Sequence, residues 1–455
     1  MRMTKQIKKN PTNSINDNQL DKTMTFTQTL ATVMGTVIGA GVFFKAADVA
    51  NITGHTSLHI FVWILAGFIS LMAGLTGAEI SAAIPETGGM IRYIDRCYGR
   101  FASFLIGWVQ FIIYFPANIA ALGIIFSTQL INLFHLPSGW LIPIAIASIV
   151  SILGINFLGA KVSGSFQSIT TIGKLIPIGA IIIFGLLSEG QVDVSLFPVE
   201  AGSSNNGFLA ALAAGLLSSM FAYDGWIHVG NVAGEMKNPR KDLPKAITFG
   251  MLGIMLVNVL VNYAYLNALP IDQIAGNETA SLQVANYYFG DMGGKIITIG
   301  ILVSVYGTIN GYTMTGIRIP YTMGTYKLLP FSDKFAALNS NKVPVLGGVI
   351  QIIIAIGMIF MGGFNMLTNM LIFVIWIFYT LVFAAVIKLR NDEPDLQRPY
   401  KVPFYPVVPI IAILGGLFIL IMTLITQFDL VVIGILMTAL GVPVYIWARK
   451  TEKDD

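Results

Sequence analysis

Apolar stretches long enough to cross a lipid bilayer follow one another along almost the whole chain. A membrane span needs about 20 apolar residues to cross roughly 30 Å of hydrocarbon. The stretches that qualify run approximately over residues 27–50, 58–84, 101–134, 138–157, 163–187, 207–234, 246–269, 294–326, 344–362, 365–388, 404–426 and 429–448. Helices satisfy their backbone hydrogen bonds within one segment, as lipid requires. The pattern therefore predicts an all-α membrane protein of about twelve transmembrane helices.

The composition agrees with a chain that is surrounded by lipid. Charged residues make up 11% of the 455 positions and hydrophobic residues 55%, whereas a soluble domain carries about 25% charged residues. The net charge of +4 lies in short loops, so it does not indicate nucleic-acid binding. The single cysteine, Cys97, excludes an internal disulfide framework. Residues 1–25 are polar, do not look like a signal peptide, and are expected to be a disordered cytoplasmic tail.

The positive charges fall in alternate loops, which indicates an orientation. With the N-terminus inside, the inside segments hold Lys5, Lys8, Lys9, Arg92, Arg96, Arg100, Lys161, Lys237, Arg240, Lys241, Lys245, Lys327, Lys334, Lys342, Lys388, Arg390, Arg398, Lys401, Arg449, Lys450 and Lys453. The outside segments hold little beyond Lys45 and Lys295, with acidic Glu189, Asp193, Glu200, Asp272, Glu278 and Asp291. We therefore expect an even number of spans, with both the 1–25 tail and the 449–455 tail in the cytoplasm.

The first span carries three glycines near its middle, in residues 35–43 (GTVIGAGVF). Each glycine costs a helix about 1 kcal/mol relative to alanine. One explanation is close packing, because small residues let transmembrane helices approach each other. The other is an unwound stretch, whose free N–H groups persist at membrane depth only beside a cavity or a ligand.

The sixth span contains a second candidate interruption, residues 221–226 (FAYDGW). Asp224 is a charge within a span and is by default a functional candidate, although it could also be a hydrogen-bonded helix-end group beside Gly225. Spans one and six are the first helices of two successive groups of five, and interruptions at matching positions indicate a binding site between inverted repeats. The domain at 26–450 then divides into repeats at about 26–188 and 206–390, with peripheral spans eleven and twelve at about 403–448.

Such interruptions offer two kinds of binding group. Free N–H groups at the start of the half-helix after Gly41 attract an anion such as a carboxylate. Exposed carbonyl oxygens at Val37 and from Phe221 to Asp224 would accept hydrogen bonds from an ammonium, each contributing about 1.5–3 kcal/mol. A ligand with both groups on one carbon is an α-amino acid.

Lys174 lies near the middle of span five, roughly 15 Å from the cytoplasmic start of that span. This depth is too great for easy snorkelling to water, and Pro177 leaves the Gly173 carbonyl without its usual donor. Three roles remain open: a lysine that reaches water along a polar wall, a fixed cation that bridges the two broken helices where a sodium ion would otherwise bind, and a proton carrier.

Several of these segments, in order and spacing, resemble the amino acid–polyamine–organocation (APC) superfamily. The 35–43 stretch resembles its first-helix signature, and residues 221–226 followed by 234–239 (GEMKNP) its sixth helix and the next loop. Residues 85–89 (PETGG) resemble its turn after helix two, and residues 318–330 the end of its eighth helix. The resemblance spans about Phe26 to Lys450 and is strongest to the L-type amino acid transporter branch, especially bacterial serine/threonine and alanine-serine-cysteine exchangers.

The resemblance implies a five-plus-five inverted-repeat (LeuT-like) fold with two extra helices. It further implies sodium-independent, obligatory exchange of small neutral L-amino acids such as alanine, serine, threonine and cysteine. The site residues that it implies are backbone N–H groups of Gly39, Ala40 and Gly41 for the carboxylate, carbonyls of Val37, Phe221 and Asp224 for the amine, Phe221 as an aromatic lid, and Lys174 in coupling. Ala40 departs from the serine common in relatives, and Asp224 from the glycine of close animal relatives, so its carbonyl is expected to act before its carboxylate.

A proton-coupled symporter on the same fold, with Lys174 or Asp224 as the proton carrier, is the main alternative. A sensor would carry a signalling domain and a channel a continuous polar pore, and the four scattered histidines suggest neither an enzyme nor a metal or cofactor site. Animal relatives carry a cysteine between helices three and four for a glycoprotein heavy chain, but residues 134–139 here have none and Cys97 is expected in the cytoplasm. We therefore expect a bacterial plasma-membrane protein without a disulfide-linked partner.

Overall fold

The computed structural model describes residues 22–190, 194, 196–202, 207–277 and 279–454, and these residues form helices and connecting segments without a β-strand. The predicted cytoplasmic tail at 1–25 lies largely outside the described residues, as do Asp193 and Glu278 of the outside loops. The all-α prediction is confirmed for the described part of the chain.

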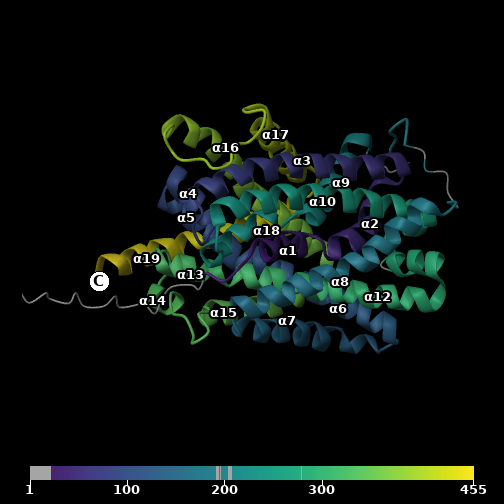
Figure 1. Ribbon diagram of the computed structural model, residues 1–455, viewed down its shortest axis with the longest axis horizontal. Coiled ribbons are helices and arrows are strands. Elements are labelled where there is room, and N and C mark those ends of the chain that lie inside the picture. The colour runs from purple at the N-terminus through teal and green to yellow at the C-terminus, as the bar shows by residue number, and fades with distance from the viewer. Residues whose placement is uncertain (1–21, 191–193, 195, 203–206, 278, 455) are drawn as a thin grey trace, which may run out of the picture.

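The long helices run side by side along one axis, which is horizontal in Figure 1. The first half of the chain contains α1 (Phe26–Val37), α2 (Ala40–Thr53), α3 (Thr56–Ala83), α4 (Met90–Tyr98), α5 (Arg100–Trp108), the π-helical η1 (Val109–Tyr114), α6 (Phe115–Phe134), the short 3₁₀ turn η2 (Ser138–Trp140), α7 (Leu141–Phe157) and α8 (Ala160–Leu187). The middle contains α9 (Gly207–Met220), the 3₁₀ segments η3 (Phe221–Tyr223) and η4 (Trp226–Glu235), α10 (Pro239–Ala268) and α11 (Ile271–Ile274). The remainder contains α12 (Ala280–Gly316), α13 (Arg318–Thr325), α14 (Ser332–Phe335), α15 (Val345–Ile359), α16 (Phe364–Asp392), α17 (Val407–Thr426), α18 (Phe428–Ala439) and α19 (Gly441–Asp454).

The number of membrane spans agrees with the sequence in all but one element. Within the described ranges, eleven helical segments are long and apolar enough to cross a membrane. The predicted ninth span, residues 344–362, contains α15, which has only 15 residues and is about 22 Å long at 1.5 Å per residue. The predicted total of twelve and the inverted repeat therefore remain predictions.

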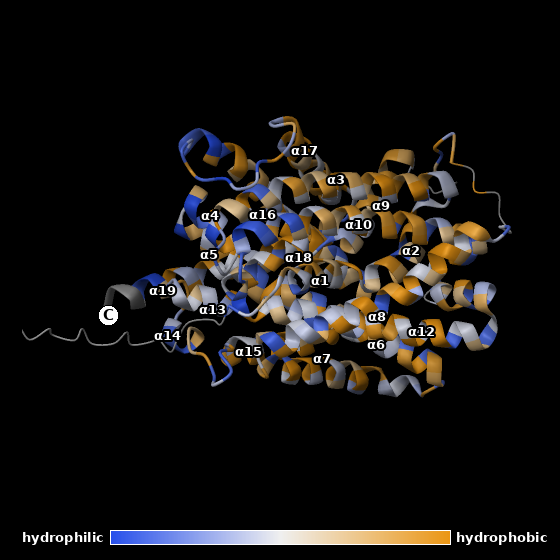
Figure 2. Cartoon of the chain, in the orientation of Figure 1, coloured by the Kyte–Doolittle hydropathy of each residue, from blue (hydrophilic) through white to orange (hydrophobic). Residues whose placement is uncertain are grey.

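The two ends of the helix bundle differ in polarity. Figure 2 shows hydrophobic residues along the helices and hydrophilic residues gathered at the left end, around α4, α13, α14 and the segment between α16 and α17. We call this end the C-terminal face, because α19 also leaves the bundle there (Figure 1). The end that carries the connection from α8 to α9 is the opposite face.

Buried and half-buried ion pairs join helices at the C-terminal face. Glu235 at the end of η4 accepts two hydrogen bonds from Arg318 of α13, at 2.7 and 3.0 Å, and both side chains are buried. Glu79 of α3 accepts two from Arg390 of α16, at 2.7 and 2.5 Å. Because a charge in such a place is stable only when it is paired, these contacts give both glutamates a structural role.

The segment before α1 is attached to the same face. The N–H of Met24 donates to the carbonyl of Glu235 at 2.8 Å, and the N–H of Lys237 donates to the carbonyl of Met24 at 3.0 Å. Thr25 then caps α1 in a capping box with Gln28. The start of the first broken helix is thereby tied to the end of the second one.

Candidate functional site

The first span is interrupted as predicted. α1 ends at Val37, Ile38 is extended with ψ 98°, and α2 begins at Ala40 after Gly39, which offers no side-chain cap. The first N–H groups of a helix have no carbonyl one turn earlier to accept their hydrogen bonds. The backbone at Gly39, Ala40 and Gly41 therefore has the geometry of an anion site, and its carboxylate-binding role stays a prediction.

The sixth span is interrupted at the predicted residues as well. α9 ends at Met220, η3 follows, and Asp224 is extended with ψ 156°. Gly225 has φ 110° before η4 begins, a left-handed conformation that favours glycine. The FAYDGW segment thus places carbonyl groups outside regular α-helix in the middle of a span.

The two interruptions lie against each other, and this explains one of the glycines. A Cβ atom at position 41 would lie 2.6 Å from Cα of Ala222 and 3.1 Å from its N, which is closer than real Cβ contacts. A Cβ at Gly225 would lie 3.0 Å from Thr36 Cγ2. Gly41, in the first turn of α2, is therefore needed for close packing, whereas Gly39 stands at the non-helical position before that helix. Both explanations suggested by the sequence hold, each for a different glycine.

The carbonyls predicted to bind an amine lie at the edges of these interruptions. Val37 is the last residue of α1, while Phe221 begins η3 and Asp224 follows it. The Phe221 carbonyl accepts only a long hydrogen bond, 3.4 Å from the Asp224 N–H. The intervening Ala222 carbonyl is bound by Asn258 Nδ2 at 3.0 Å. Their role towards an ammonium remains a prediction.

Lys174 is fully buried and reaches the first interruption. Its Nζ donates to the carbonyl oxygens of Gly35 at 2.8 Å and Ile38 at 2.6 Å, and to Thr308 Oγ1 of α12 at 3.1 Å. Of the three roles that the sequence leaves open for Lys174, the bridge between the two broken helices is matched on one side. The contacts described for Lys174 join the first broken helix to α12 and include none with the 221–226 segment.

Thr308 is a further residue at this contact, and the only signal for it in the sequence is the polar stretch of span eight in which it lies. Its hydroxyl is within hydrogen-bond distance of the Gly35 carbonyl, at 3.2 Å, and of the Ser304 carbonyl in its own helix, at 2.9 Å. A Cβ at Gly39 would lie 2.3 Å from Thr308 Oγ1. Gly39 thus lets the interruption approach α12 closely enough for Lys174 and Thr308 to share its carbonyl groups.

The Asp224 carboxylate is held by two tyrosines from other spans. Tyr114, the last residue of the π-helical η1, donates its hydroxyl to one oxygen, and Tyr379 of α16 donates to the other at 2.7 Å. The Tyr379 hydroxyl also lies 3.0 Å from His228 Nε2. All four side chains are buried. Both carboxylate oxygens are thus occupied, in agreement with the hydrogen-bonded helix-end group that the sequence left open.

Phe221, the predicted lid, is buried where α9, α2 and α16 meet. Its ring packs edge to face against Phe364 of α16, with ring centroids 5.4 Å apart. Lys45 lies 5.9 Å from the Phe221 ring centroid. The charge pattern along the sequence counts Lys45 with the outside segments, which is wrong: Lys45 is a buried residue of α2.

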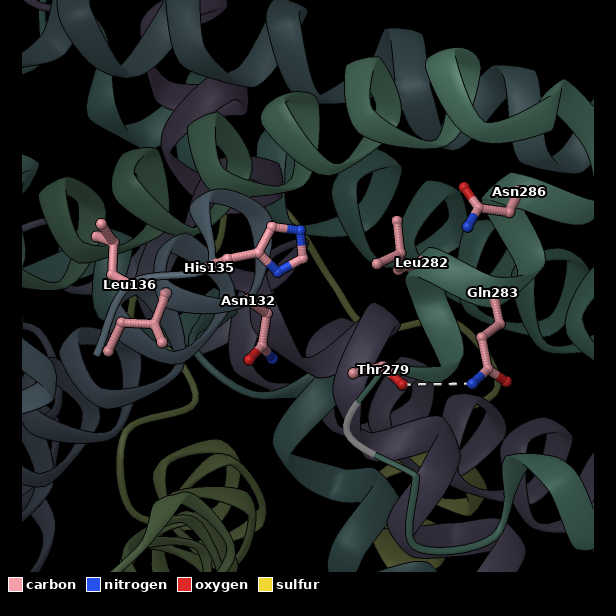
Figure 3. Close-up of a pocket in the computed structure, with 8 residues that line it drawn as sticks. Asn132, His135, Leu136, Thr279, Leu282, Gln283 and Asn286 are labelled. Carbon is pink, nitrogen blue, oxygen red and sulfur yellow. Dashed lines mark hydrogen bonds between the residues drawn. The ribbon is translucent and has the colours of Figure 1, made fainter. Parts of the chain in front are cut away.

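A separate open pocket of about 500 Å³ lies between the end of α6 and the start of α12. Figure 3 shows its lining residues, which combine polar and aliphatic side chains: Ile131, Asn132, His135, Leu136, Thr279, Leu282, Gln283 and Asn286. The predicted site residues do not line it, and it is unrelated to the two interruptions.

Comparison with known proteins finds relatives along almost the whole chain. The family model described as "Amino acid permease" matches residues 24–447. The chain is 40% identical over 438 residues to the serine/threonine exchanger SteT of Bacillus subtilis, an alignment that covers 96% of this chain and 99% of that protein. It is 27% identical to the human cystine/glutamate transporter, covering 95% of this chain and 87% of the relative. It is also 27% identical to the human large neutral amino acids transporter small subunit 2, covering 92% and 80%.

Proposed function

The chain belongs to the amino acid permease family, and from this membership we propose that it exchanges small neutral L-amino acids across the bacterial plasma membrane without sodium. The observation that carries the proposal is the contact between the two helix interruptions. It brings the first N–H groups of α2 close to the non-helical backbone of residues 221–224. Anion-attracting and ammonium-attracting groups then face one small ligand.

The proposed roles follow from these backbone groups. The N–H groups of Gly39, Ala40 and Gly41 bind the carboxylate, and the carbonyls of Val37, Phe221 and Asp224 bind the amine. The name of the Bacillus subtilis relative suggests serine and threonine as substrates and exchange as the mode. Because Tyr114 and Tyr379 occupy the Asp224 carboxylate, its carbonyl remains the group that faces the ligand.

Lys174 supports exchange that does not depend on sodium. Its ammonium already donates hydrogen bonds to the carbonyl oxygens of Gly35 and Ile38, which are oxygen ligands of the kind a hard cation would need. We propose that this contact couples binding at the first interruption to movement of α8 and α12. A proton-coupled symporter is the alternative, but the Bacillus subtilis relative is named as an exchanger, which favours exchange.

We place the domain at residues 26–450, with both tails in the cytoplasm and the C-terminal face inside. The arginines and lysines of this face support the orientation through the positive-inside rule. The only cysteine, Cys97, lies in α4 of the same face, and burial raises the pKa of its thiol to about 11. A protonated, half-buried cytoplasmic thiol is a poor partner for a disulfide, so we propose that the chain works without a disulfide-linked heavy chain.

Counterflow in liposomes tests the proposed exchange. Purified protein is reconstituted without sodium and with equal pH on both sides, and uptake of labelled serine is compared between vesicles filled with unlabelled serine and vesicles filled with buffer. We expect uptake that requires internal amino acid. Equal uptake into both sets, rising with an inward proton gradient, would contradict exchange and favour the symporter.

Phe221→Ala should weaken closure over the substrate. The variant loses the edge-to-face contact with Phe364, and an aromatic pair contributes about 0.5–1.5 kcal/mol, so the half-saturating concentration for exchange should rise up to about tenfold. Exchange kinetics measure this, with Phe249→Ala, an exposed phenylalanine of α10, as the control. Wild-type affinity and rate in Phe221→Ala would remove this residue from the gate.

A further inference from the structure

Lys45 is a buried cation that neither the predicted binding groups nor Lys174 explains. It lies in α2, one helical turn beyond Gly41, and its side chain has 0% exposure. An ionisable residue buried within a span is costly, and it is by default a functional candidate with a partner to be named. The partners of Lys45 therefore indicate which part of the protein it acts on.

The Lys45 ammonium joins α2 to α16. Its Nζ donates to Oδ1 of Asn365 at 3.0 Å and of Asn369 at 3.1 Å, both on the first turns of α16. It also pairs with Asp48 of its own helix at 3.3 Å, and Ser218 of α9 donates to the same Asp48 oxygen at 2.6 Å. One polar cluster thus holds together the half-helix after the first interruption, the half-helix before the second, and α16.

The same ammonium lies beside two aromatic rings. Nζ is 5.4 Å from the centroid of Phe364 and 5.9 Å from that of Phe221, and the two rings contact each other edge to face. A cation within about 6 Å of a ring centroid is attracted to the face of the ring, and more strongly where water is excluded. The Lys45 side chain is fully buried, so water does not weaken this attraction.

The position of the cluster relates it to one face of the molecule. α16 ends at Asp392 near the C-terminal face, where the neighbouring Glu393 pairs with Arg96 of α4. The first turns of α16, which contact Lys45, therefore lie towards the opposite face. The cluster is located between that face and the two interruptions, where a closure of the site from this side would have to form.

We propose that Lys45 is a positioning residue that holds the Phe221 ring in its closed arrangement. The asparagines of α16 anchor the ammonium, and the ammonium in turn keeps the Phe221 and Phe364 rings together above the interruptions. Movement of α2 and α9 away from α16 breaks these contacts and frees the ring. This inference rests on the proposed exchange function, because Phe221 is a lid only if a substrate binds below it.

A simple ion pair would not need this arrangement. Lys45 and Asp48 are three residues apart on one helix, where they could pair without contact to α16 or to either ring. The geometry instead directs the ammonium to two amide oxygens and two aromatic faces of neighbouring elements. Substitutions that remove the charge of Lys45 but keep its hydrogen-bond donors therefore distinguish a local ion pair with Asp48 from a role in positioning the Phe221 ring.

The test measures exchange kinetics in liposomes for Lys45→Met, Lys45→Gln and Lys45→Arg. Lys45→Met should raise the KM for external serine about tenfold, as loss of the cation–π contacts and anchor predicts. Lys45→Gln retains donors for the asparagines but no charge, so its KM should rise similarly, while Lys45→Arg should stay closer to wild type. Lys295→Met removes an exposed lysine of α12 and should change nothing.

A double-mutant cycle with Phe221→Leu shows whether Lys45 acts through the ring. If it does, Lys45→Met should add little to the KM of Phe221→Leu, because coupled residues are non-additive. If the fold-changes in KM of Lys45→Met and Phe221→Leu multiply in the double variant, the proposal is overturned in favour of a structural role. A wild-type KM in Lys45→Gln would overturn it as well. So would unfolding of both Lys45→Met and Lys45→Gln in detergent.

The outcomes also separate this inference from the proposed function. Wild-type protein that shows no counterflow would refute the exchange function itself. Wild-type protein that exchanges normally while the charge-removing variants keep its KM would refute only the role of Lys45.

Discussion

Lys174→Ala should yield a folded protein whose exchange rate falls by at least about tenfold, the change expected from 1.4 kcal/mol. The ammonium supplies hydrogen bonds to the Gly35 and Ile38 carbonyls at the end of α1. Hydrogen bonds to charged groups contribute about 1.5–3 kcal/mol each, and a buried acceptor left without a donor is costly. Without Lys174, the end of α1 loses its link to α8 and α12, so the interruption no longer holds one geometry.

The measurement is counterflow of labelled serine, normalised to the amount of folded protein from size-exclusion chromatography. Lys161→Ala provides the matched control, because Lys161 is exposed at the start of the same helix. Leakage of amino acid from vesicles without external substrate would show that tight exchange is lost. Wild-type turnover of Lys174→Ala would remove the lysine from the mechanism.

Gly41→Val should abolish exchange. A Cβ at position 41 would lie 2.6 Å from Cα of Ala222, and the two further methyl groups of valine need still more room. Overpacking of this kind costs about 1–3 kcal/mol. The atoms that a side chain at position 41 would meet belong to Ala222 of the second interruption. The two interruptions should therefore move apart. The backbone groups proposed to bind the substrate carboxylate would then no longer lie opposite those proposed to bind its amine.

Substrate-dependent thermal stabilisation measures binding without transport. Wild-type protein should gain stability with added serine, since a ligand that binds only the native state stabilises it, and Gly41→Val should gain none. Gly179→Val is the control, because a Cβ at this α8 glycine meets nothing within 4 Å. Gly41→Ala gives an intermediate test if valine prevents folding. Unchanged serine affinity in either Gly41 variant would contradict the site.

Local sequence patterns predicted the membrane spans and the two helix interruptions, because both depend on the residues of a single segment. Lipid requires long apolar stretches, so eleven of the predicted spans correspond to helices of sufficient length, and glycine-rich or charged interruptions in two of them correspond to real breaks. α15 is the exception: it lies within a predicted span, but its helix ends after 15 residues. Apolar composition alone does not show where a helix ends.

Side-chain partners were not predictable in the same way. Asp224 is held by Tyr114 and Tyr379, and Lys45 by Asn365 and Asn369, all from distant spans. An isolated tyrosine or asparagine in an apolar span carries no periodic signal, because its role depends on which helix face meets which neighbour. For the same reason, the distribution of charges along the sequence does not show that Lys45 is buried against α16.

The sequence by itself determined the class of protein, the positions of the two interruptions and the backbone groups that they expose. These follow from hydropathy, from the cost of glycine in a helix and from the hydrogen-bonding needs of a backbone in lipid. Only the tertiary structure decided that Gly41 packs on Ala222, that Lys174 joins α1 to α12, and that Lys45 reaches α16 and the Phe221 ring. The reason is that such contacts depend on the packing angles and register of whole helices, which no single segment specifies.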